Sequence, residues 1–110
     1  MPLLASMLGA IAIFHSEISR AGEFSAADVM KWDRKAQDFF IQTSVTMIGV
    51  VMTQARREYA SCVDRWYAAS DEKVRMGRHD QVLEVMRQYP DYHPQAVILA
   101  VVKKQCGALK

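Results

Sequence analysis

The sequence lacks an excess of charge of either sign. Its 110 residues carry 14 Lys and Arg against 12 Asp and Glu, a net charge of +2. Like-charged neighbours occur only in pairs such as Arg56-Arg57, so the basic stripe typical of a nucleic-acid-binding protein is missing. Hydrophobic residues make up 51% of the chain, too many for a disordered protein. We therefore expect one folded domain that binds no nucleic acid.

Catalytic motifs are missing as well. The chain has no glycine-rich phosphate loop and no Gly-x-Ser-x-Gly sequence. His79 and His93 do not have the i, i+4 spacing that places two metal ligands on one helix face. Asp91 and His93 could share a metal, but a histidine in such a turn is more often a surface residue. We expect solvent-exposed positions on helix faces for four carboxylates, Asp64, Asp71, Asp80 and Glu84. Nothing in the sequence indicates that two of them form a buried acid–base pair with separated pKa values. The sequence predicts neither an enzyme nor a bound cofactor.

The longest apolar run is too short to cross a membrane. It covers Pro2–Phe14, about 13 residues where a spanning helix needs about 20, and it matches the core of a signal peptide. Ser19-Arg20-Ala21 then offers small residues at the −3 and −1 positions of a cleavage site. No Lys or Arg precedes the run, so the alternative is an N-terminal helix packed on the domain. We expect a signal peptide at residues 1–21 and a single helical domain at 22–110, periplasmic or secreted.

Cysteine is scarce, and its two copies predict one disulfide. Cys62 and Cys106 are not arranged as Cys-x-x-Cys, and paired cysteines persist in oxidising compartments. Closing a loop of about 44 residues would stabilise the fold by roughly 4 kcal/mol in the chain-entropy model. Two buried free thiols are the alternative. A disulfide would also remove the free thiol that a Cys–His nucleophile needs.

Helical periodicity dominates the first half of the expected domain. Ser25 is typical of an N-cap, with Asp28 in the first turn. A break near Asp33–Ala36 would separate a short helix from a long one that reaches Ser70 and bends at Gly49. The apolar positions of the long helix are three, four or seven apart: Phe40, Met47, Val51, Ala55, Tyr59, Cys62 and Trp66, with Ile41, Val45, Ile48 and Met52 widening the stripe.

Two further helices are expected in the second half. The mostly polar residues 70–79 indicate a connection, and the following helix should end before Pro90. Ala96–Val102 is apolar throughout and could form a buried strand, but Pro94 before it and Gly107 after it favour a helix. Because no second strand is available, we predict an all-α, four-helix bundle-like domain with this last helix at its centre.

The aromatic residues supply the candidate binding site. Trp66 and Tyr89 fall on the apolar stripes, which favours the core, whereas Tyr67 and Tyr92 lie off the stripes. Tyrosine is enriched among the residues that dominate binding energy at protein interfaces. We therefore predict a protein-binding surface at the Tyr89–His93 turn with Tyr67 nearby. Its candidate residues are Tyr67, Tyr89, Tyr92 and His93.

The order of these features resembles a known family. The features are Ser25-Ala26-Ala27-Asp28, Ser44 and Gly49, Cys62-Val63, Val82 to Pro90, and Ala96 to Cys106. This pattern is similar to the small periplasmic helical immunity proteins of the Rap and Tai families, which protect bacteria against type VI secretion amidase effectors. The chain departs from the family in having Val63-Asp64 where a proline usually follows the first cysteine. The resemblance implies a periplasmic helical protein that inhibits a cell-wall-degrading enzyme.

Our leading prediction is a non-enzymatic, exported binding protein that acts by surface occlusion on a protein partner, for which the resemblance suggests a hydrolase effector. One alternative is a chaperone-like or structural envelope protein, and binding to many unfolded clients would favour it. The other is a cytosolic helical dimerisation module, with a homodimer as the functional unit. An uncleaved N-terminus and free thiols would favour that reading.

Overall fold

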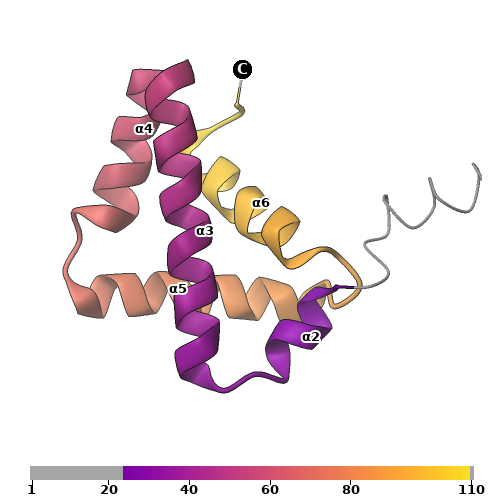
Figure 1. Cartoon of the computed structure of the whole chain (residues 1–110). Helices are drawn as coiled ribbons and strands as arrows, with labels where there is room; N and C mark the ends of the chain where they lie inside the picture. Colours follow the sequence, from indigo (N-terminus) through magenta and orange to yellow (C-terminus); the bar gives the residue numbers. More distant parts are fainter. Residues whose placement is uncertain (1–23, 110) are drawn as a thin grey trace, which may run out of the picture.

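The chain is helical throughout most of the part that the computed structural model describes, residues 24–109. The elements are α2 (Ala26–Met30), α3 (Arg34–Ala55), α4 (Arg57–Val63), the π-helical turn η1 (Asp64–Ala68), α5 (Glu72–Gln88) and α6 (Pro94–Cys106). No strand occurs within this described part, so the predicted all-α class is confirmed. The predicted signal peptide at residues 1–21 lies outside it. In Figure 1, α4 lies beside one half of α3, and α5 runs across α3 instead of along it.

Side-chain caps separate the first two helices. Ser25 and Asp28 form a capping box in which the main-chain N–H of Ser25 donates to Asp28 Oδ2 over 2.9 Å. Asp33 caps α3 by accepting from the main-chain N–H of Ala36 at 2.8 Å. Both caps satisfy amides that a helix leaves free at its start. The predicted break near Asp33–Ala36 is therefore confirmed.

The long helix ends at Arg56, so the predicted continuation to Ser70 is wrong. α3 passes through Gly49 without interruption, whereas Arg56 is extended, with φ −152° and ψ 101°. The chain then reverses, so that α4 packs back against α3. No glycine or proline marks this reversal. Helical periodicity resumes directly after it, which explains why the sequence suggested one continuous helix.

The turn η1 places two adjacent aromatic side chains in the core. Trp66 is 4% exposed and Tyr67 is 3% exposed. On a regular α-helix neighbouring residues point about 100° apart, so a stripe that includes Trp66 does not by itself place Tyr67 in the core. A π-helical turn has more residues per turn and changes this relation. The expectation that Tyr67 lies off the buried face was wrong for this reason, whereas the core position of Trp66 is confirmed.

The expected connection at residues 70–79 is mostly helix. Asp71 caps α5 by accepting from the main-chain N–H of Val74 at 2.9 Å, and the helix continues from Glu72 to Gln88. The polar side chains that suggested a loop lie mainly on the exposed face of α5. His79, in the middle of that segment, is fully buried.

The end of α5 and the whole of α6 follow the sequence signals. α5 stops before Pro90, and Pro94 is the first residue of α6. Gly107 ends α6 with φ +94°, a conformation that favours glycine. However, α6 is not enclosed on all sides, because Ala96 and Ala100 are exposed. Its buried face consists of Pro94, Val97, Ile98, Val101 and Val102.

Cys62 and Cys106 form the predicted disulfide, which joins α4 to the end of α6. Two hydrogen bonds hold the chain just beyond it. The hydroxyl of Tyr59 donates to the carbonyl of Gly107 at 2.7 Å, and Arg56 donates to the carbonyl of Ala108 at 3.2 Å. The C-terminal end is therefore fixed to the same corner as the α3–α4 reversal.

The face of α3 that forms the core is only part of the predicted stripe. Ile41, Val45 and Met52 are buried, but Met47 and Val51 are 60% and 54% exposed. Apolar residues occur on both faces of this helix, so periodicity alone could not select the inner one. Within residues 24–109, no helix is both long enough and apolar enough to cross a membrane.

Candidate protein-binding surface

The turn between α5 and α6 presents two tyrosine rings to solvent. Tyr89 is 48% exposed and Tyr92 is 58% exposed, and their ring centroids lie 5.3 Å apart in an edge-to-face arrangement. Tyr89 was expected in the core because it continues the apolar stripe of α5. It is the C-cap residue, with φ −129° and ψ 61°, so it leaves the helical path and the stripe ends before it. We call this feature the tyrosine turn, residues 89–93.

Helix α2 fixes the shape of the tyrosine turn. The main-chain N–H of Ala26 donates to the carbonyl of Tyr92 at 2.8 Å, and that of Ala27 donates to the carbonyl of Pro90 at 2.9 Å. These amides belong to the first turn of α2, where a helix has no partners of its own for them. One short helix is therefore used to clamp the turn, and a surface held in one shape loses less conformational entropy when it binds.

His93 supports the turn more than it extends the surface. Its Nδ1 accepts from the main-chain N–H of Gln95 at 3.1 Å, which makes it the N-cap of α6. The half-buried His93 ring also packs edge-on against Phe24, at 5.6 Å between centroids. Phe24 in turn contacts Trp32 and Phe40. The structure thus brings His93 together with Tyr89 and Tyr92 as predicted, but mainly as a support.

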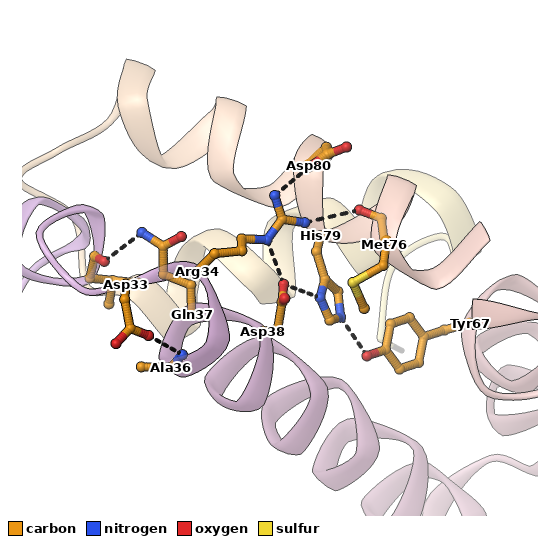
Figure 2. A network of polar contacts seen from close by, with 10 residues as sticks. Asp33, Arg34, Ala36, Gln37, Asp38, Tyr67, Met76, His79 and Asp80 are labelled. Atoms are coloured by element: carbon orange, nitrogen blue, oxygen red, sulfur yellow. Dashed lines mark hydrogen bonds and ion pairs between the residues drawn. The ribbon is translucent and has the colours of Figure 1, made fainter. Parts of the chain in front are cut away.

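Tyr67 lies apart from the tyrosine turn, in a buried polar network that the sequence did not reveal. Its hydroxyl is 2.6 Å from Nε2 of His79, and Nδ1 of His79 is 2.8 Å from Oδ1 of Asp38. Arg34 donates to Asp38 and to Asp80, each at 2.7 Å. Figure 2 shows this chain of contacts linking α3, α5 and η1. Tyr67 is therefore not part of the surface formed by the tyrosine turn.

The electrostatics of the network favour an ionised Asp38 and a protonated Tyr67. Partial burial raises the pKa of Asp38, but the hydrogen bonds from Arg34 and His79 outweigh it and hold that pKa below its ordinary value. Burial raises the pKa of Tyr67 to about 12. A carboxylate can only accept, so Nδ1 of His79 donates to Asp38, while Nε2 of the same ring is hydrogen-bonded to the hydroxyl of Tyr67.

This order of groups resembles a catalytic relay, but the hydroxyl at its end faces the core. Tyr67 and His79 are 3% and 0% exposed, so no substrate reaches either group. The network instead connects three elements through polar contacts within the interior. Among residues 24–109, no group of three or more His, Cys, Asp or Glu side chains is placed to hold a metal ion.

A second exposed feature lies on the outer face of α3. The α3 outer stripe consists of apolar side chains that are more than half exposed: Phe39, Met47, Val50 and Val51. Thr43 lies between them, and its hydroxyl donates to the carbonyl of Phe39 at 3.0 Å. No charged residue occurs from Phe39 to Ala55. Contiguous exposed apolar surface of this kind often marks an interaction site.

No protein-family model, curated protein or solved structure matches this chain. The resemblance to the Rap and Tai immunity proteins stays a prediction from sequence features.

Proposed function

We propose that this chain is an exported, non-enzymatic binding domain that occludes a protein partner with its tyrosine turn. The observation that carries the proposal is the exposed Tyr89–Tyr92 pair on a turn clamped by α2. Tyrosine combines a large apolar ring with a polar hydroxyl and has few rotatable bonds, so it binds with little loss of conformational entropy. Among the described residues, neither hydroxyl has a hydrogen-bond partner, which leaves both for a partner protein.

The disulfide supports the exported part of the proposal. A Cys62–Cys106 bond persists in an oxidising compartment such as the periplasm or the extracellular space. Within that compartment, the resemblance to immunity proteins suggests a hydrolase effector that degrades the cell wall as the partner. Occlusion requires only that the turn cover the entrance to the partner's active site. The bound chain would then need no chemistry of its own.

The direct test is recovery of the partner from the envelope fraction of the native host. The tagged chain is compared with Tyr89→Ala/Tyr92→Ala and with Val74→Ala, a control that removes another exposed apolar side chain. We expect wild type and control to retain one partner and the double variant to lose it, because truncating an interfacial tyrosine weakens binding by about tenfold or more. Equal recovery by the double variant would contradict the proposal.

Export is tested separately by intact mass. The mass of the native protein should correspond to Gly22–Lys110 less two hydrogens. A chain that begins at Met1 or Pro2 and carries two alkylatable thiols would overturn the exported reading and favour a cytosolic helical module.

The second candidate function is that of a chaperone-like envelope protein. The observation in its favour is the α3 outer stripe, which offers exposed apolar side chains including the flexible Met47. A chaperone would recover many unfolded clients, and their binding would not depend on Tyr89 and Tyr92. The same recovery experiment therefore separates the two functions.

A further inference from the structure

A groove runs between α3 and the α4–η1 segment, at the opposite end of α3 from α2. It consists of two adjoining hollows that share Thr53, Ala60 and Asp64. One hollow, of about 210 Å³, is mainly apolar and is lined by Val45, Val50 and Val63 among others. The other, of about 510 Å³, is more polar and open. We call the two together the α3–α4 groove.

Small side chains create the floor of the groove. Gly49 and Ala60 face it from the two helices, together with Thr53. A Cβ atom added at Gly49 would lie 3.8 Å from Cγ1 of Val63, an ordinary van der Waals contact, so the absence of a side chain here leaves the floor of the groove low. Val50 lines the groove and also belongs to the α3 outer stripe, so the two apolar surfaces are continuous.

Two arginines stand at the polar end of the groove. Arg57 and Arg65 both line it and are exposed. Within the described part of the chain neither forms an ion pair, in contrast to Arg56, which pairs with Glu58 at 3.1 Å. Asp64 is the one carboxylate among the lining residues, so this end carries a net positive charge. Arg57 begins α4 and Arg65 lies in η1, eight positions later, so their backbones are about two helical turns apart, on the order of 11 Å along the axis.

We propose that the α3–α4 groove binds an acidic amphipathic helix of a protein partner. Apolar side chains of that helix pack on the exposed Val50 and Met47, above the buried Val45 and Val63 at the floor of the groove. Carboxylates two turns apart on the same helix meet Arg57 and Arg65, because two turns rise about 11 Å and match their separation. A helix laid into an apolar groove is a recurrent mode of peptide recognition.

The charges favour this occupant over a second copy of the chain. The α3 outer stripe of another copy would offer apolar contacts, but it has no carboxylate from Phe39 to Ala55 to place against Arg57 and Arg65. An acidic amphipathic helix supplies both the apolar contacts and the carboxylates. The groove is separate from the tyrosine turn, so the inference depends on the proposed function only in taking the ligand to be a protein.

The test starts from a phage-displayed library of random helical peptides, selected on the intact, oxidised chain. We expect the enriched peptides to share apolar residues at i, i+3, i+4 and i+7 and two carboxylates seven or eight positions apart. The best peptide is then synthesised with Glu and with Gln at those two positions. Binding of each is measured by fluorescence anisotropy and located by amide chemical-shift changes.

Charge variants identify the role of the arginines. Arg57→Gln/Arg65→Gln should weaken binding of the Glu peptide by about tenfold and leave binding of the Gln peptide unchanged. The reason is that two exposed ion pairs together contribute about the free energy of a tenfold change in affinity. The control Lys73→Gln/Arg87→Gln removes the same charge from the exposed face of α5 and should have no effect. Gly49→Leu places a larger side chain on the floor of the groove and should weaken binding of both peptides.

Several outcomes would overturn the proposal. The selection could enrich no peptide, or enrich peptides that lack the two carboxylates. The Arg57→Gln/Arg65→Gln variant could bind the Glu peptide as tightly as the wild type. The amide chemical-shift changes could lie outside the groove. A concentration-dependent dimer that buries the groove and is abolished by Gly49→Leu would also overturn it, by making a second copy the occupant. None of these results bears on Tyr89 and Tyr92, so the proposed function is judged independently.

Discussion

The hydroxyl of Tyr67 and Nε2 of His79 lie 2.6 Å apart in the core, where they join η1 to α5. Asp38 completes the chain of contacts from α3 through Nδ1 of the same ring. Both nitrogens of this buried imidazole are therefore partnered. A polar network that is fully satisfied can stabilise one arrangement of the helices, because any other arrangement leaves a buried group without a partner.

The first prediction concerns the Tyr67 hydroxyl. Tyr67→Phe should lower the free energy of unfolding by about 1–3 kcal/mol, because Nε2 of His79 is then buried without a partner. Urea denaturation at pH 7 measures this change. The matched control Tyr92→Phe removes a hydroxyl from an exposed ring and should change stability by less than about 0.5 kcal/mol. Equal effects of the two substitutions would show that the Tyr67–His79 bond adds nothing to stability.

The second prediction concerns pH. The pKa of Asp38 is lowered in the folded protein, so its stabilising contribution is present above the unfolded value of about 3.9 and is lost as pH falls through the folded pKa. Asp38→Asn should therefore destabilise the fold by about 1–3 kcal/mol at pH 7, because the hydrogen bonds lost are made to a charged group. The difference from wild type should shrink once the pH falls below about 4.

Unfolding free energies measured from pH 7 down to pH 3 test this dependence. Asp91→Asn is the control, since it removes an exposed carboxylate. A difference between wild type and Asp38→Asn that stayed constant across this range would mean that the charge of Asp38 is not responsible.

The local signals in the sequence predicted helix ends well. Ser25 with Asp28 marked the start of α2, and Pro94 marked the start of α6, because caps act through the nearest few residues. The reversal at Arg56 has no such local signal. It depends on the packing of α4 against α3, which is a tertiary contact. Residues 70–79 were misread because their polarity reflects a solvent-facing helix side, not a loop.

The candidate site was also only partly predictable from local sequence signals. Tyr92 was expected off the apolar stripe and is exposed. Tyr67 was misplaced because η1 changes the helical register over five residues. His79 could have been found by extending the Val82–Met86 stripe back by three positions into the segment read as a connection. Asp38 could not be identified from the sequence as the partner of His79, because the two residues lie 41 positions apart and only the packing of the helices brings them together.

The third prediction compares two glycines. Gly77 lies inside α5 with no atom within 4 Å of an added Cβ, so Gly77→Ala should stabilise the protein by about 0.5–1 kcal/mol. Gly107 has φ +94°, so Gly107→Ala should destabilise it by about 1–3 kcal/mol. Thermal unfolding of both variants gives the signs directly. Stabilisation by both substitutions would contradict the left-handed conformation at Gly107.

The last prediction concerns the disulfide. Cys62→Ala/Cys106→Ala opens a loop with a sequence separation of 44, which should cost roughly 4 kcal/mol in the chain-entropy model. Chemical denaturation of the oxidised protein, the reduced protein and the double variant measures this difference. The reduced protein and the variant should have similar midpoints, both well below that of the oxidised protein. If all three coincided, the hydrogen bonds from Tyr59 and Arg56 to the C-terminal end would be sufficient to hold that corner, and the disulfide would add no stability.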